Sequence, residues 1–175
     1  MLKQIFSLLV YVSVAVFTFI ILTTAFNNNA AMHENNYAKG ELIGYSNCKI
    51  PGDTSFCFGH ASNEDCIEYK YDGKGTLRLT HINSVFSLCP GKLTADITVN
   101  TGSIVIEEHE TGIGCFEMCL YNLDYVINNL NPDTYSVKVL SPYPVKKRPL
   151  EFSVDLTHAG NGSFHLTRNV YPWGT

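Results

Sequence analysis

Charged residues are scarce in this sequence, at 16% of the chain, and Lys and Arg together number only 12 against 16 Asp and Glu. The only basic cluster, residues 146–148, lies between two prolines, and we interpret it as a solvated loop. Nucleic-acid affinity comes mainly from clustered cations that neutralise phosphates. The composition therefore argues against a nucleic-acid partner.

The sequence also lacks recognisable catalytic signatures. It contains no G-x-S-x-G nucleophile elbow, and Ser84, Ser87 and Ser103 have no identifiable base. His81 and His165 occupy alternating positions in apolar runs, which is typical of hydrogen-bonded sheet histidines. We therefore assign no catalytic residue, no metal ligand and no cofactor.

One long hydrophobic run lies near the N-terminus. Residues 5–26 are apolar or hydroxylated without a charge, and Lys3 is the only charged residue among the first thirty. At about 1.5 Å per residue, a helix of this length can cross a hydrocarbon core of roughly 30 Å. We expect residues 1–26 to be a transmembrane anchor or a cleaved signal peptide. Either alternative makes the membrane a partner and places the remaining chain outside the cytoplasm.

The remaining chain divides into a linker and one domain. Residues 27–40 are polar, Asn-rich and aperiodic, as is typical of a linker. After residue 40, short alternating runs are separated by Gly, Asn, Asp or Pro, and no helical period persists. The expected strands lie at residues 66–71, 77–82, 93–99, 104–106, 119–127, 135–139, 150–156 and 164–166. Residues 41–175 therefore predict an all-β, two-sheet antiparallel sandwich, Ig-like or transthyretin-like, with a barrel as the alternative.

All six cysteines lie in the predicted exported part, at Cys48, Cys57, Cys66, Cys89, Cys115 and Cys119. In an oxidising compartment such a set predicts disulfides, whose pairing the sequence alone does not determine. We favour Cys48 with Cys66 across the first loop, and Cys89 with Cys115 or Cys119.

A thiolate metal site is the alternative for these cysteines. Cys115 and Cys119 are four residues apart, and Cys89, His81 and His109 would complete a tetrahedral set. On a strand, however, residues four apart are separated by about 13 Å. Disulfides are therefore preferred.

The densest polar cluster is Glu107-Glu108-His109-Glu110, a candidate cation or acid/base site. Consecutive strand residues point to opposite faces, so these side chains do not converge. We interpret them as the solvated end of a hairpin strand that begins at Ser103. Asp96, Asp124 and Asp133 lack the spacing of a calcium loop.

Two C-terminal features have alternative interpretations. Asn161-Gly162-Ser163 matches a glycosylation sequon, but we favour a tight turn. Residues 171–174 contain the only tryptophan, Trp173. We expect this segment to fold back onto the sheet, with a ligand contact as the alternative.

Several stretches resemble a family of short exported bacterial proteins of unknown function. They are residues 65–69 through 81–83, Cys89-Pro90, residues 119–125 (CLYNLDY) and residues 171–174 (YPWG). The resemblance spans most of the predicted domain and implies export without implying an activity. It departs from the family's doubled Cys-Cys-Pro, because Leu88 stands at the first position.

A second resemblance concerns residues 130–139 (LNPDTYSVKV), which are similar to the L-x-P-G-x-Y-x-V-x-V stretch of carboxypeptidase-regulatory-like sandwich modules. Asp133 replaces the usual glycine. This resemblance implies a strand–turn–strand corner and bears on the fold, not on function.

The expected function is a non-catalytic sandwich, membrane-anchored or secreted, that binds an unknown protein or surface ligand or serves a structural role in the envelope. The alternative is a metal-dependent protein or enzyme that uses Glu108, His109 and the cysteines near residue 115.

Overall fold

The computed structural model of the protein describes residues 37–49, 64–112, 115–143 and 149–168. Within these residues the chain forms nine strands and no helix, which confirms the predicted all-β class. The strands are β1 (Lys39–Tyr45), β2 (Glu64–Tyr71), β3 (Leu77–Ser87), β4 (Lys92–Asn100), β5 (Ser103–Thr111), β6 (Met118–Asn128), β7 (Thr134–Leu140), β8 (Leu150–Asp155) and β9 (Gly160–Thr167).

The predicted anchor or signal segment, residues 5–26, lies outside the described residues. In the described part of the chain, no helix is long and apolar enough to cross a bilayer. The basic loop at residues 146–148 and the C-terminal segment with Trp173 also lie outside the described residues.

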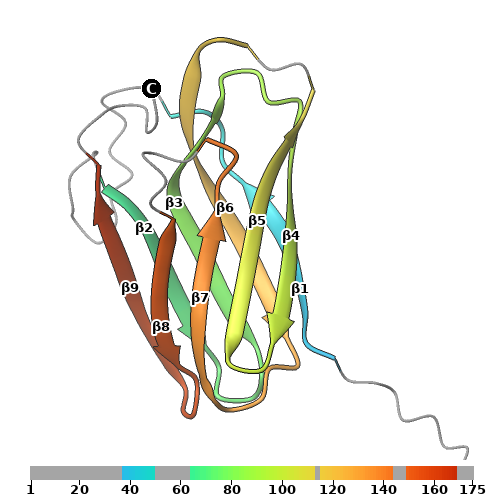
Figure 1. Ribbon diagram of the computed structural model, residues 1–175, viewed down its shortest axis with the longest axis vertical. Coiled ribbons are helices and arrows are strands. Elements are labelled where there is room, and N and C mark those ends of the chain that lie inside the picture. Colours follow the sequence, from blue (N-terminus) through green and yellow to red (C-terminus); the bar gives the residue numbers. More distant parts are fainter. Residues whose placement is uncertain (1–36, 50–63, 113–114, 144–148, 169–175) are drawn as a thin grey trace, which may run out of the picture. The chain divides into compact units, whose positions relative to one another are not determined.

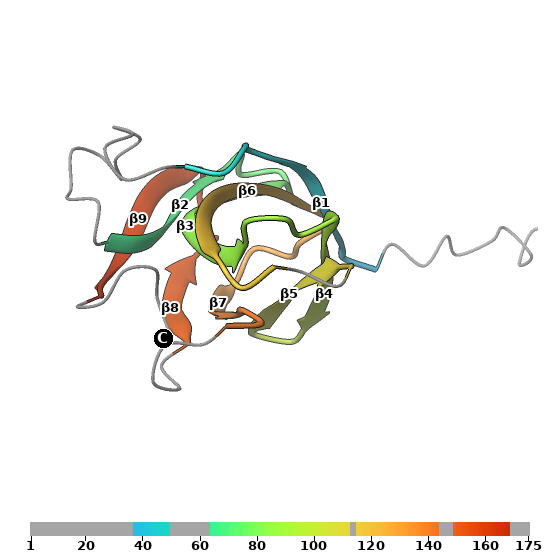
Figure 2. The ribbon, with the colours of Figure 1, turned by 90° about the horizontal axis from the view of Figure 1, so that it is seen from above.

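The strands form two sheets that face each other (Figures 1 and 2). The five-stranded sheet has the order β1-β6-β3-β2-β9, and the four-stranded sheet has the order β4-β5-β7-β8. The prediction of antiparallel sheets is wrong at one pair, because β5 and β7 run parallel. The strand between them in sequence, β6, belongs to the opposite sheet, so the chain crosses over and returns in the same direction.

The core follows from the two-residue period of the strands. In β8, Leu150, Phe152 and Val154 are buried, while Glu151 and Ser153 are exposed. The same period places the apolar residues of β7 inside. Burial of these inward rows from both sheets, at about 25 cal/mol per Å² of apolar surface, is the main stabilising term. The alternation in the sequence thus places the core correctly.

The two lateral edges of the sandwich are packed differently. On one side, Gly40 of β1 lies so close to β4 that an added Cβ would be 2.7 Å from the Cβ of Ile97. On the other side, the rings of Phe152 in β8 and Phe164 in β9 stack at a centroid distance of 5.3 Å. Both contacts join the two sheets.

The two ends of the sandwich also differ (Figure 1). At the end where β1 begins, which we call the turn end, the connections are residues 72–76, 101–102, 129–133 and 156–159. At the opposite end, which we call the loop end, the chain leaves one strand and enters the next between Tyr45 and Glu64, Ser87 and Lys92, Thr111 and Met118, and Leu140 and Leu150. The longer connections therefore leave from the loop end.

Two boundaries differ from those expected. β1 begins at Lys39, inside the predicted linker, and its two glycines interrupt the alternation that would have revealed it. The predicted turn at Asn161-Gly162-Ser163 is wrong, because these residues belong to β9 and pair with β2. The ring of Tyr69 covers Gly162, at 2.9 Å from where a Cβ would be, so the strand continues through the glycine.

Replacing Gly40 tests the closed side of the sandwich. Gly40→Ala is expected to lower the free energy of unfolding by about 1–3 kcal/mol, because its methyl group overlaps Ile97. Gly44→Ala in the same strand is the control, since an added Cβ there meets no atom within 4 Å. Urea unfolding of both variants measures the difference. Equal stability of the two variants would contradict this packing.

Candidate functional site

A bulge in β3 brings two polar side chains into the interior. His81 pairs with Leu123 and Ser84 pairs with Tyr121, so Ile82 and Asn83 share one partner position on β6. In a regular strand, His81 and Ser84 would point to opposite faces. The extra residue returns both to the interior, and Asn83 takes the left-handed φ of 69° that asparagine tolerates.

Hydrogen bonds from three other segments hold the bulge. The Asn83 amide accepts a hydrogen bond from Lys49 Nζ at 3.0 Å and donates one to the carbonyl oxygen of Glu64 at 2.6 Å. The backbone N–H of Asn83 donates to Asn122 Oδ1 at 3.3 Å, and Lys49 Nζ donates to the same oxygen. Lys49 and Asn83 are both buried. The bulge is thus a hydrogen-bonded part of the fold.

The opposite sheet contributes Glu108, whose side chain is completely buried. It follows Ile104 and Ile106 on the inward face of β5. Glu108 Oε1 accepts hydrogen bonds from His81 Nδ1 and from the Tyr125 hydroxyl, each at 2.5 Å, and Oε2 accepts one from Ser84 Oγ at 2.6 Å. Glu108 therefore joins β5 to β3 and β6 across the interior.

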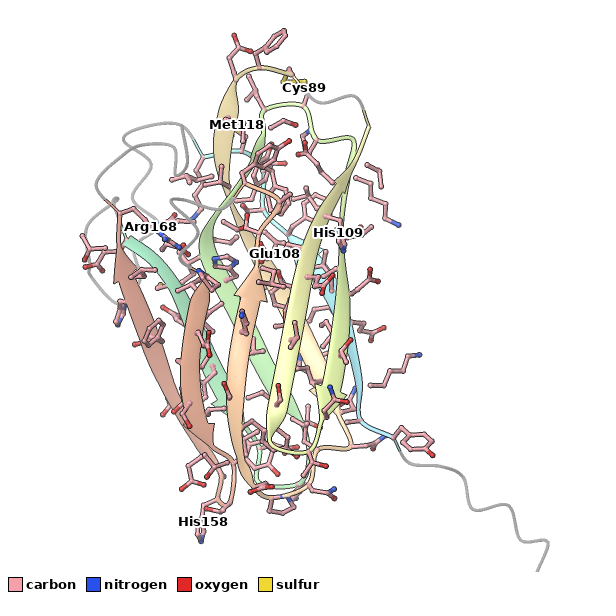
Figure 3. The ribbon with its side chains drawn as sticks, viewed as in Figure 1. Cys89, Glu108, His109, Met118, His158 and Arg168 are labelled. Carbon is pink, nitrogen blue, oxygen red and sulfur yellow. A yellow bond between two sulfur atoms is a disulfide. The ribbon has the colours of Figure 1, made fainter. Side chains whose placement is uncertain are left out.

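The network continues from the other ring nitrogen of His81. His81 Nε2 donates to Asp65 Oδ1 at 2.7 Å, and Asp65 Oδ2 accepts hydrogen bonds from the Arg168 guanidinium, with Nε at 3.0 Å. Arg168 directly follows β9. Figure 3 shows Arg168 toward the loop end of the sandwich and Glu108 between the sheets. Arg168, Asp65, His81 and Glu108 form a buried row of alternating charges, which we call the ionic row.

The two carboxylates determine the protonation state of His81. Burial lowers the pKa of this ring, but the charges of Glu108 and Asp65 outweigh it and raise the pKa to about 10. At neutral pH both ring nitrogens therefore donate. Burial, followed by the charge of Glu108, raises the pKa of Tyr125 well above its ordinary value, so its hydroxyl stays a donor. The row contains two cations and two anions.

This arrangement differs from that of a catalytic triad. In a triad, the histidine accepts the proton of the nucleophilic serine. Here Ser84 donates to Glu108, and both nitrogens of His81 already donate to carboxylates. His81 is therefore unable to act as a base toward Ser84, and the geometry serves cohesion between the sheets.

The structure divides the predicted cluster of residues 107–110 between the two faces of β5. Glu107 is exposed, and His109 Nε2 lies 3.2 Å from Asp96 Oδ2 on the outer surface. Glu108 is buried, and Glu110 accepts hydrogen bonds from Ser87 at 3.0 Å. The prediction of a solvated strand end is therefore wrong for Glu108 and Glu110. Both lie at the alternating positions of β5 that face the interior, as Ile104 and Ile106 do.

The described disulfides are Cys48–Cys119 and Cys89–Cys115, both at the loop end. Cys89–Cys115 is one of the two predicted alternatives. The predicted Cys48–Cys66 pair is wrong. β1 pairs with β6 and not with β2, so Cys48, which follows β1, lies beside Cys119 of β6 and is bonded to it. Cys66 is also disulfide-bonded, while Cys57 lies outside the described residues.

The alternative thiolate metal site is not formed. Cys89, Cys115 and Cys119 are consumed in disulfides, His81 is held between carboxylates, and His109 lies on the outer surface. Among the described residues, no group of three or more His, Cys, Asp or Glu side chains is placed to hold a metal ion.

Apolar side chains are exposed beside the Cys89–Cys115 disulfide. Phe116 is fully exposed, and Leu88 is 46% exposed. The backbone N–H of Leu88 donates to the carbonyl oxygen of Glu117 at 2.7 Å, so the two loops are joined by a hydrogen bond as well as by the disulfide. We call Leu88 and Phe116 the apolar tip.

Comparisons of the chain with family models, with curated proteins and with solved structures find no match. The site is therefore interpreted from its own geometry. It consists of a hydrogen-bonded interior and a cross-linked loop end that presents the apolar tip.

Removing the Glu108 carboxylate tests the ionic row. Glu108→Leu leaves the His81 imidazolium, Ser84 and Tyr125 without their acceptor, so the free energy of unfolding is expected to fall by about 3–5 kcal/mol. Glu107→Leu is the matched control, because its side chain faces solvent. Denaturant unfolding compares the two, and a similar loss in both variants would contradict the assignment.

The raised pKa of His81 also predicts a pH dependence of stability. The folded protein binds this proton with a pKa of about 10, against 6.5 ordinarily, so the stabilisation is complete below pH 6.5 and is lost as the pH rises toward 10. The slope approaches about 1.4 kcal/mol per pH unit at most. Chemical unfolding at several pH values in this range measures it. His81→Gln is expected to flatten the slope and the exposed-site variant His109→Gln to retain it; equal slopes in the two variants would contradict this origin.

Proposed function

We propose that this protein is an exported, non-catalytic sandwich, anchored in the membrane or secreted, that binds a protein or surface ligand through its loop end. The observation that carries the proposal is the gathering of both described disulfides and the apolar tip at the end opposite the chain's entry. Binding sites of sandwich domains commonly lie on loops at one end of a rigid scaffold.

Export is supported by the cysteines and by the N-terminal segment. Disulfides persist in oxidising compartments and are rare in the cytosol, and no described cysteine is free. The uncharged run of residues 5–26 supplies a means of membrane targeting. The chain enters the sandwich at β1, at the turn end.

The absence of a catalytic role is supported by how the buried polar groups are used. Glu108 accepts three hydrogen bonds, and the two nitrogens of His81 are both engaged. A general base needs an accessible acceptor atom near its substrate. These groups are buried and paired with each other, so we assign them to stability.

The apolar tip has the properties of a binding anchor. Exposed aromatic residues often contribute most of the energy of an interface, and rigid ones lose little entropy on binding. Phe116 directly follows Cys115, whose disulfide to Cys89 restrains the loop. We propose that a pocket on the partner receives Phe116, with Leu88 at its rim.

We further propose that the sandwich is Ig-like or transthyretin-like, and that the chain belongs with the short exported bacterial proteins that it resembles. The two facing sheets and the crossover between β5 and β7 are compatible with either architecture. The resemblance rests on residues 65–83, Cys89-Pro90, residues 119–125 and residues 171–174.

Site-specific photo-crosslinking tests this proposal in the cells that make the protein. A benzoylphenylalanine residue at position 116 is expected to give an adduct of defined mass, whereas the same residue at Thr98, which is exposed on β4, gives none. Deleting residues 1–26 retains the chain in the cytoplasm and is expected to abolish the adduct. Equal adducts from both positions, or an adduct that survives the deletion, would overturn the proposal.

A further inference from the structure

The sandwich has four edge strands, and three of them carry features that discourage pairing with another chain. Exposed sheet edges invite such pairing unless charges, prolines or bulges block it. β1 carries a register shift between Leu42 and Gly44, and its side packs against β4. β4 presents Lys92 and Asp96 to solvent, and β8 presents Glu151 and Asp155.

The fourth edge strand, β9, has none of these features. Its sequence, GNGSFHLT, contains no Lys, Arg, Asp, Glu or Pro. It pairs with β2 without any register shift, from Gly160 opposite Tyr71 to Thr167 opposite Glu64. No other strand of the described residues pairs with its second edge. β9 is therefore a regular edge without Lys, Arg, Asp or Glu, and its one titratable side chain, His165, lies 3.9 Å from Glu64 of β2.

Two aromatic contacts hold β9 in position. Tyr69 lies against Gly162, and the ring of Phe164 stacks on Phe152 of the opposite sheet. Phe164 and Leu166 nevertheless remain only partly buried. The strand is thus fixed in position while apolar surface along it still faces solvent, and covering that surface would be favourable.

The absence of Lys, Arg, Asp and Glu makes this edge compatible with a copy of itself. In a two-fold antiparallel pair, each strand faces the same sequence, so a charged residue near the axis meets a like charge, which is destabilising. β9 brings no carboxylate, ammonium or guanidinium group to the axis. The nearest acidic and basic residues on the outer face of the same sheet, Glu64, Glu68 and Lys70, lie on β2, one strand further in.

We propose that two copies of this protein associate through β9, edge to edge and antiparallel. The five-stranded sheets of the two copies then form one continuous sheet across a two-fold axis, and the partner's strand covers Phe164 and Leu166. This association leaves the loop end of each copy free, so it is independent of the proposed binding function.

A charge-swap experiment on the full-length chain in detergent tests the proposal. Gly162 and Phe164 of β9 pair with Tyr69 and Ile67, which face the core. Asn161 and Ser163 alternate with them and therefore share the outer face of β9. The wild type is expected to sediment as a dimer. The variants Asn161→Lys/Ser163→Lys and Asn161→Glu/Ser163→Glu are each expected to weaken the dimer about tenfold or more. Mixing the two variants is expected to restore association as a heterodimer.

The control places the same charges on another edge. Thr98→Lys/Asn100→Lys on β4 is expected to leave the dimer unchanged, since both side chains already face solvent there. Circular dichroism and non-reducing peptide maps verify that every variant folds. A monomeric wild type overturns the proposal, as does a dimer that persists in both β9 variants. A mixture that fails to associate also overturns it.

Discussion

The interior of this sandwich is organised around one buried carboxylate. Taking the charge of Glu108 out of water costs several kcal/mol unless cations and hydrogen-bond donors surround it. The fold supplies His81, Ser84 and Tyr125, and His81 in turn requires Asp65, which requires Arg168. The need to neutralise this buried charge therefore fixes the positions of strands in both sheets and of Arg168, which follows β9.

The interior changes in character between its two ends. β5 places Ile104 and Ile106 near the turn end and Glu108 and Glu110 toward the loop end, and β3 likewise passes from leucines to His81. Apolar packing is non-directional, whereas hydrogen bonds depend on strand register and are sensitive to small displacements. The directional contacts thus lie toward the loop end, which carries the binding site that we propose.

The sequence predicts what depends on local pattern. The alternation of Leu150, Phe152 and Val154 identifies strand and buried face together, and the same parity rule, continued from Ile106, would have placed Glu108 inside. What it does not predict depends on distant partners. The bulge at Asn83 requires Lys49 and Asn122. The partner of Cys48 depends on the pairing of β1 with β6, and the glycines of β1 interrupt the alternation that would have predicted this strand. Long-range pairing decides these features, and no local propensity encodes it.

The span of the Cys48–Cys119 bridge, 71 residues, has a consequence for biogenesis. A chain that crosses a membrane from its N-terminus exposes Cys48 first, and Cys57, Cys66, Cys89 and Cys115 all follow before Cys119. Early oxidation of Cys48 with any of these thiols forms a bond that is not native, and thiolate attack must later exchange that bond. Under the export that we propose, correct pairing of Cys48 consequently requires a thiol–disulfide isomerase, or oxidation slow enough for β6 to arrive first.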